Sequence, residues 1–190
     1  MEVEKDLILK AVSGDRLAFG QVVELSYDAV FHFCYKYCGH REDAEDIAQE
    51  VFTKLGSTIF NFKGNSSFKT WLFAIAVNTS KDHFRKIKAK KETAFDEGFE
   101  VESGSASQEQ VLHSKQLLRA IADLPQKIKD AVMLVCSEGF SHAEAGRVLG
   151  CSEGTISWRI HEARKTLAAF KSNLALTSIL ILVWIWTTIK

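Results

Sequence analysis

The segment REDAEDIAQEVF, residues 41–52, separates polar from apolar residues with helical spacing. Its apolar residues recur every three or four positions, as on the buried face of an amphipathic helix. The other side includes four groups that accept hydrogen bonds: Asp43, Asp46, Gln49 and Glu50. Carboxylates one turn apart repel each other, and they form charge-assisted hydrogen bonds with arginine or lysine. The stripe therefore predicts docking of a basic partner; the alternative is a solvated acidic face.

A second charged stretch, residues 81–91, is basic. It contains one acid, Asp82, and six basic residues: Lys81, Arg85, Lys86, Lys88, Lys90 and Lys91. Such a run favours contact with phosphates, with an affinity that falls as salt rises. A solvated basic end of a helix is the alternative.

The remaining residues show no catalytic pattern. There is no glycine-rich phosphate loop, nucleophile motif or metal-ligand pair at useful spacing, so the sequence predicts no enzyme activity, cofactor or metal. The charged start MEVEKDLILK lacks the apolar core of a signal peptide, which predicts a protein of the cytoplasm. Because the cytoplasm is reducing, the four cysteines are expected to be free thiols. Cys34 and Cys38 lie near two histidines, so a zinc or redox site is the alternative to two small buried thiols.

These residues must be positioned by helices, because helical periodicity covers most of the chain. It predicts one or two helices starting near Asp15, a helix over 42–55, a loop at 61–68 and a long helix behind it. The sequence favours an all-α protein with two small helical domains. The predicted divisions are domains at 1–94 and 113–171, a flexible acidic linker at 95–112 and an apolar tail at 172–190.

The second domain ends in a helix-turn-helix pattern. Ser141 and Glu144 have capping-box spacing at the start of a short helix that ends at Leu149. Gly150 supplies the turn, and Ser152 caps the next helix. Such a unit offers its second helix to the DNA major groove. A plain helical hairpin is the alternative.

The order of these pieces resembles the extracytoplasmic-function (ECF) sigma factors. The resemblance covers roughly residues 5–170 and rests on five motifs in order: GDRLAF (14–19), REDAEDIAQEVF (41–52), SSFKTWLFAIAVNTSKDHFR (66–85), LPQKIKDAVML (124–134) and EGFSHAEAGRVLGCSEGTISWRIHEARKTL (138–167). It implies a promoter-recognition subunit that binds bacterial core RNA polymerase and opens promoter DNA. It also implies an anti-sigma factor or another regulatory partner.

The resemblance gives the acidic helix and the loop behind it specific roles. Asp46, Gln49 and Glu50 match positions that contact a basic coiled coil of the polymerase beta-prime subunit; Asp43 extends this surface, and the beta subunit is a further expected partner. The loop with its following helix matches the reader of the −10 element as single-stranded DNA, which requires hydrogen-bonding groups and stacking rings. The residues expected there are Phe62, Lys63, Asn65, Ser66, Ser67, Phe68, Lys69, Asn78, Lys81 and Arg85. Trp71 fits core packing as well as stacking.

The helix-turn-helix matches the reader of double-stranded DNA at the −35 element. The expected contacts are Thr155, Ser157, Trp158, Arg159, His161, Arg164 and Lys165. A basic residue is common in the family where this chain has Ser157 and Glu162, and Trp158 replaces a small residue. Ala145 and Gly146 replace an Ile-Ala pair. These departures predict weakened −35 reading, assisted by another DNA-bound protein or a ribonucleoprotein.

The linker and the tail allow several roles. The linker acids either mimic phosphates in the polymerase cleft, as the resemblance implies, or belong to a solvated tether. The tail, residues 172–189, is uncharged, and as a helix it would span about 27 Å. It is an anchor in the inner membrane, a segment that docks on a protein, or a segment packed on its own domain. The alternative function for the whole chain is a stand-alone helix-turn-helix regulator without polymerase binding.

Overall fold

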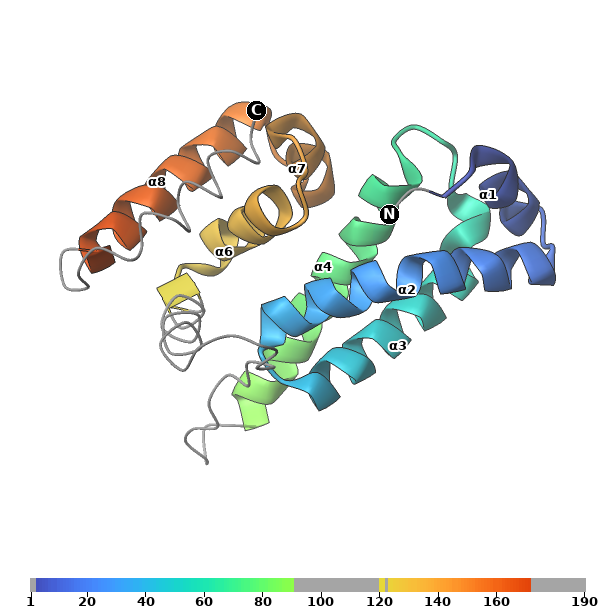
Figure 1. The fold of residues 1–190 in the computed structure, drawn as a ribbon, viewed down its shortest axis with the longest axis horizontal. Coiled ribbons are helices and arrows are strands. Elements are labelled where there is room, and N and C mark those ends of the chain that lie inside the picture. The colour runs from blue at the N-terminus through green and yellow to red at the C-terminus, as the bar shows by residue number, and fades with distance from the viewer. Residues whose placement is uncertain (1–2, 91–119, 122, 172–190) are drawn as a thin grey trace, which may run out of the picture. The chain divides into compact units, whose positions relative to one another are not determined.

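A computed structural model describes residues 3–90, 120–121 and 123–171. The chain divides into two compact units, Met1–Glu100 and Val101–Lys190, and each is considered by itself. The described residues form helices and turns without a strand (Figure 1), which confirms the predicted all-α fold. The predicted linker at 95–112 and the predicted tail at 172–190 lie outside the described residues.

The first unit is built on three long helices. These are α2 (Arg16–Cys38), α3 (Arg41–Thr58) and α4 (Phe68–Lys90), preceded by the short α1 (Lys5–Val12). A 3₁₀ turn, η1 (Ile59–Asn61), follows α3. Helices α2 and α3 run side by side, and α4 packs on both (Figure 1). The loop between η1 and α4 is the one that the sequence predicts.

Local chemistry sets the ends of α2. The Asp15 carboxylate accepts hydrogen bonds from the backbone N–H groups of Leu17 (2.9 Å) and Ala18 (3.1 Å). This N-cap satisfies donors that the first helical turn leaves unpaired. At the other end Gly39 has a φ of +84°, a left-handed conformation that glycine adopts without steric cost. The predicted helix start near Asp15 is therefore confirmed.

The apolar face of α3 fixes the orientation of its acidic face. Ile47, Val51 and Leu55 have no exposed surface and pack against α2 and α4. Burying each such side chain contributes about 1.5–3 kcal/mol relative to leaving it in water. Because these residues occupy one face, the polar residues between them must point away from the core.

The second unit contains the helix-turn-helix. The elements described in this unit include α6 (Gln126–Val132), the π-helical η3 (Met133–Ser137), α7 (His142–Leu149) and α8 (Glu153–Lys171). Helices α7 and α8, joined through Gly150, form the helix-turn-helix. Ser141 and Glu144 form the predicted capping box, and Gly150 turns the chain with a φ of +63°. The Ser152 hydroxyl accepts a hydrogen bond from the Thr155 N–H at 3.2 Å, as predicted for the cap of α8.

The four cysteines are free thiols, and Cys34 and Cys38 are buried in the first unit. Their burial supports the interpretation as small apolar core residues rather than ligands open to a metal. Within the parts of the chain that the structure describes, no helix combines the length and apolar character needed to cross a membrane.

Candidate functional site

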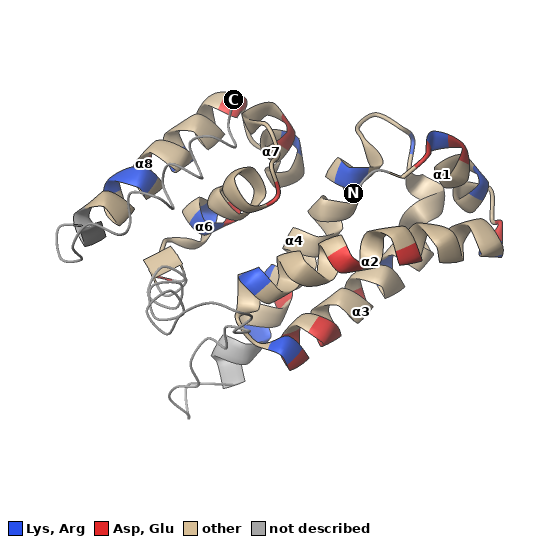
Figure 2. Cartoon of the chain, in the orientation of Figure 1, with Lys and Arg blue, Asp and Glu red and all other residues tan. Residues whose placement is uncertain are grey.

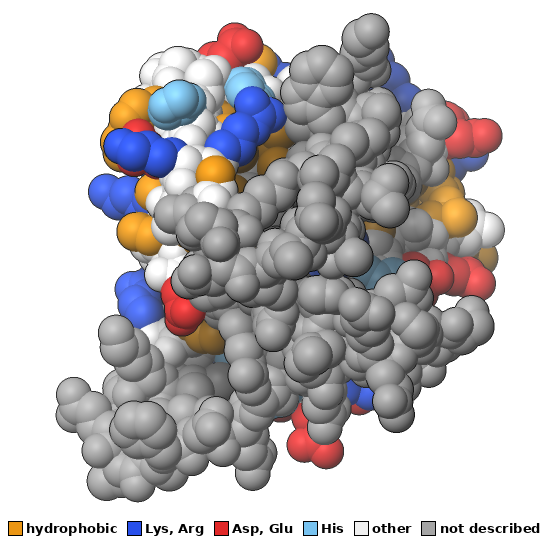
Figure 3. All heavy atoms as spheres, turned by 60° about the vertical axis from the view of Figure 1, so that its left-hand side comes forward, with side chains coloured by type: hydrophobic (Ala, Val, Ile, Leu, Met, Phe, Trp, Pro, Cys, Tyr) orange, Lys and Arg blue, Asp and Glu red, His pale blue; other side chains and the backbone are white. Residues whose placement is uncertain are grey.

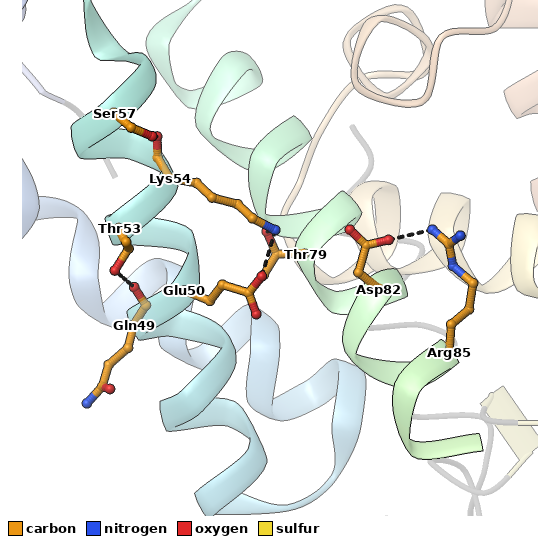
Figure 4. Close-up of polar contacts among 8 residues, drawn as sticks. All are labelled: Gln49, Glu50, Thr53, Lys54, Ser57, Thr79, Asp82 and Arg85. Atoms are coloured by element: carbon orange, nitrogen blue, oxygen red, sulfur yellow. Dashed lines mark hydrogen bonds and ion pairs between the residues drawn. The ribbon is translucent and has the colours of Figure 1, made fainter. Parts of the chain in front are cut away.

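The outer side of α3 carries the predicted acidic stripe. Asp46 and Gln49 are exposed, and we call these two residues the crest of α3. Figure 4 shows the Gln49 side chain pointing away from α4, while Figure 2 shows acidic positions in the N-terminal half of α3. The crest is thus open to a partner.

The other two predicted acids lean from the crest toward α4. Glu50 forms an ion pair with Lys54 at 2.8 Å, and Lys54 also donates a hydrogen bond to the hydroxyl of the buried Thr79 at 3.1 Å (Figure 4). Asp43 lies 3.3 Å from the Nε2 atom of His83 on α4. Glu50 and Asp43 therefore have internal partners, whereas the crest residues face solvent.

The ion pair at Glu50 has a consequence for stability. The hydrogen bond from Lys54 lowers the pKa of the Glu50 carboxyl. A carboxyl with a lowered folded pKa stabilises the fold above its unfolded pKa, and this contribution is lost as the pH falls through the folded value. Glu50→Gln is expected to reduce the free energy of unfolding at pH 7 by less than about 1 kcal/mol, since the pair is partly exposed.

The free energy of unfolding of the same variant, measured by urea denaturation, should equal that of the wild type once the pH is below the folded pKa of Glu50. A difference between the two proteins that is as large in acid as at pH 7 would contradict a charge-dependent role for this pair.

The loop before α4 brings together aromatic rings and short polar groups. The Ser67 hydroxyl accepts the Thr70 N–H at 3.1 Å, so Ser67 caps α4. Phe68 is only 5% exposed and packs under the loop, whereas Phe62 and Trp71 are half-buried, with ring centroids 5.4 Å apart. Lys63 and Asn65 are exposed and Ser66 is partly exposed. Phe62 and Trp71 are therefore the rings of this group that remain accessible for stacking.

The predicted DNA-facing residues of α4 differ in how far they reach solvent. Asn78 and Arg85 are exposed, and Arg85 donates a hydrogen bond to Asp82 (Figure 4). Lys81 is half-buried, and the Nζ atom of Lys69 lies 5.9 Å from the centroid of the Phe73 ring. Asn78 and Arg85 lie about three and five turns from the start of α4, so α4 extends the polar surface of the loop.

In the helix-turn-helix, the predicted −35 contacts lie on or beside the exposed face of α8. Trp158 is 58% exposed, His161, Arg164 and Lys165 are exposed, and Thr155 and Arg159 are partly exposed. The Ser157 hydroxyl lies 2.8 Å from the Nδ1 atom of His142, which links α8 to α7. Figure 3 shows histidine and basic side chains gathered over this unit.

Two features of these surfaces were not predicted from the sequence. Phe60, in η1, is 61% exposed although the adjacent Ile59 is buried. The hydrogen bond from Lys54, the ion-pair partner of Glu50, to Thr79 joins residues 25 positions apart in the chain. The Glu50–Lys54 pair has a sequence signal, the i, i+4 spacing of opposite charges on one helix.

Known proteins share both units. The model of Sigma-70 region 2 matches residues 22–90, and that of Sigma-70 region 4 matches residues 114–167. The ECF RNA polymerase sigma factor SigW of Bacillus subtilis is 33% identical over 175 residues, which cover 86% of this chain and 94% of SigW. The RNA polymerase sigma-H factor of Pseudomonas aeruginosa is 30% identical over 179 residues, covering 87% and 92% respectively.

A solved structure agrees with these matches. The sigma factor RpoE of Bartonella quintana, in complex with the anti-sigma factor NepR, superposes with a TM-score of 0.69 at 25% identity. The match covers 82% of this chain and 98% of that protein. The two matched regions, the level of identity and the shared helical architecture lead to one conclusion: the chain belongs to the ECF sigma factors and acts in directing transcription initiation.

Proposed function

We propose that this sigma factor binds core RNA polymerase through the crest of α3 and opens the −10 element as single-stranded DNA. The observation that carries the first part is the exposure of Asp46 and Gln49 beside acids that already have internal partners. Exposed hydrogen-bond acceptors on a rigid helix can form charge-assisted bonds with a basic helix of the polymerase without rearrangement. The beta-prime and beta subunits are the proposed contacts.

The second part rests on the loop and the start of α4. Half-buried Phe62 and Trp71 offer ring faces for unstacked bases, and Asn65 and Ser66 offer hydrogen-bonding groups beside them. Base–aromatic stacking contributes about 1–3 kcal/mol for each base. The exposed Asn78 and Arg85 would then follow the strand backbone along α4.

Promoter melting by this loop is tested by the permanganate reactivity of unpaired thymines in complexes of promoter, core polymerase and sigma factor. Phe62→Ala combined with Asn65→Ala is expected to reduce reactivity at −10 while leaving core binding unchanged. Ser57→Ala, an exposed change on α3, serves as the matched control. Full thymine reactivity with the double variant would contradict the assignment of the loop.

We also propose that the helix-turn-helix reads the −35 element weakly. Supporting this, the Ser157 hydroxyl is engaged by His142, partly exposed Glu162 would face phosphates, and an exposed apolar Trp158 occupies the reading face. A second DNA-bound protein or a ribonucleoprotein would then help to place the factor. Comparable nuclease protection over −35 and −10 with core polymerase alone would contradict this part.

Ser157→Arg is expected to strengthen binding of the upstream promoter duplex. One added phosphate contact should make the slope of log affinity against log salt more negative by about one. The matched control is Thr166→Arg, which adds the same charge to an exposed position about half a turn around α8. Fluorescence anisotropy with a −35 duplex measures both variants; equal slopes would show that position 157 does not meet DNA.

An inhibitory protein is the further proposed partner. The Bartonella quintana relative was solved with an anti-sigma factor, and by analogy we propose that a protein of this class holds the present chain inactive. Its affinity for the chain, measured with and without core polymerase, would show whether the two partners compete.

A further inference from the structure

Phe60, directly before the loop that leads into α4, has the most exposed aromatic side chain of the described residues, at 61%. Among these residues no second ring stacks on it, whereas Phe62, Phe68 and Trp71 contact one another. The ring of Phe60 is therefore separate from the aromatic cluster of the loop, and both of its faces are open.

The backbone holds Phe60 in this position. The N–H of Ile59 bonds to the carbonyl of Leu55, so η1 continues α3 without a break. The side chain of Ile59 is 1% exposed, and its carbonyl accepts the Phe62 N–H at 3.0 Å. Successive side chains of a 3₁₀ helix point about 120° apart. Because Ile59 points into the core, Phe60 must point away from it, and its exposure is built into the turn.

The charge around Phe60 indicates the type of ligand. Residues 51–81 contain no Asp or Glu, and they carry four lysines: Lys54, Lys63, Lys69 and Lys81. Lys63 is exposed and follows Phe60 by three positions. On α1, which packs against η1, Asp6 already forms an ion pair with Lys10 at 2.7 Å. Rings that stack on bases, next to cations that meet phosphates, are typical of surfaces that bind single-stranded nucleic acid.

Phe60 lies at one end of the surface proposed to hold the open strand. Asn78 and Arg85 lie about 15 and 25 Å along α4 from its first residue. The turn η1 precedes the loop and packs on α1, at the end of the unit where α4 begins (Figure 1). A strand that passes over the loop and follows α4 toward Arg85 would therefore have its other side next to Phe60.

We propose that Phe60 stacks on an unpaired base of the opened promoter, next to the bases held by Phe62 and Trp71 and on the side away from Arg85. The strand would then be held at two places, one on each side of the loop. This inference rests on the proposed opening of the −10 element by the loop.

The test measures the affinity of the full chain, bound to core RNA polymerase, for a promoter duplex whose −10 segment is noncomplementary and therefore already open. The promoter is one that the wild type selects in run-off transcription. Phe60→Ala should bind at least about fivefold more weakly, as expected for one lost stacking contact. Phe60→Tyr keeps the ring and should bind within about twofold of the wild type, whereas Phe60→Leu, which is apolar but not flat, should lose several-fold.

Leu17→Ala is the matched control, because it also removes an exposed apolar side chain, 83% exposed, from the first unit. It should leave the affinity for the open promoter unchanged. Thermal unfolding and the affinity for core polymerase alone should be the same for all of these variants. If Phe60→Ala weakens the binding of core polymerase alone, the ring contacts polymerase and the inference is overturned.

Promoters with a single abasic site, placed at each position of the open segment in turn, locate the contact. At the position that meets Phe60, removal of the base should weaken binding of the wild type and should weaken binding of Phe60→Ala no further. This position should adjoin the positions that respond in the same way to Phe62→Ala. Losses that add at every position would overturn the inference.

The two proposals fail in different ways. If Phe62→Ala lowers the affinity for the open promoter and Phe60→Ala does not, Phe60 has no part in holding the strand and the assignment of the loop stands. If neither variant lowers this affinity, the proposed function of the loop fails, and the inference about Phe60 fails with it.

Discussion

Asp46→Arg is expected to lower the affinity of the chain for core RNA polymerase by at least about tenfold, because it replaces an attraction to a basic helix by a repulsion. Asp46 is exposed on α3, so its replacement should leave the fold intact. Fluorescence anisotropy or surface plasmon resonance with purified core polymerase gives the affinity. The loss should shrink at high salt, since added ions screen the exposed charges.

Glu4→Arg is the matched control for Asp46→Arg. It makes the same change in net charge in the same unit, at an exposed residue that precedes α1 and forms no side-chain cap. Equal losses in the two variants would show that polymerase responds to the overall charge of the unit rather than to the crest, and would contradict the proposed contact.

Gly146→Val is expected to destabilise the helix-turn-helix by about 1–3 kcal/mol, the usual effect of overpacking. A Cβ atom at Gly146 would lie 2.7 Å from the backbone oxygen of Cys151, a contact that the turn can relieve only by moving. Hydrogen exchange measured by mass spectrometry on peptides from α7 and α8 should show faster exchange. Binding to upstream promoter DNA should weaken with it, since the turn after α7 positions α8, which carries the proposed reading face.

Gly154→Val supplies the comparison, because it is also a glycine in a helix. A Cβ atom there would meet only the Ser152 hydroxyl, at 4.0 Å. We expect this change to alter stability by less than about 0.5 kcal/mol, as helix propensities suggest. Similar effects of the two variants would show that the close approach at Gly146 does not restrain the turn.

Local signals predicted most of the elements. The N-cap at Asp15, the capping box at Ser141 and the turn at Gly150 each depend on residues within a few positions, and the structure contains all three. The period of α3 likewise predicted its buried face, because a helix repeats every 3.6 residues, although Phe52 on that face is only half-buried. Fold class and element order follow from such short-range rules.

Contacts between helices could not be predicted in the same way. The pairing of Asp43 with His83 spans 40 positions, and that of Ser157 with His142 spans 15. Each depends on how two helices cross, which periodicity does not encode. The burial of Phe68 has the same origin, because a ring at the start of a helix can turn toward the core or toward solvent. The sequence therefore predicted the surfaces, and the packing decided which of their side chains remain available.

The measurement that tests the central claim most directly is run-off transcription with purified core RNA polymerase on a library of the host's own promoters. The account predicts that the chain directs initiation from promoters with a shared −10 sequence and that Asp46→Arg abolishes these transcripts. Duplex DNA binding by the chain in the absence of core polymerase, with no specific transcript in its presence, would contradict the account and favour a stand-alone regulator.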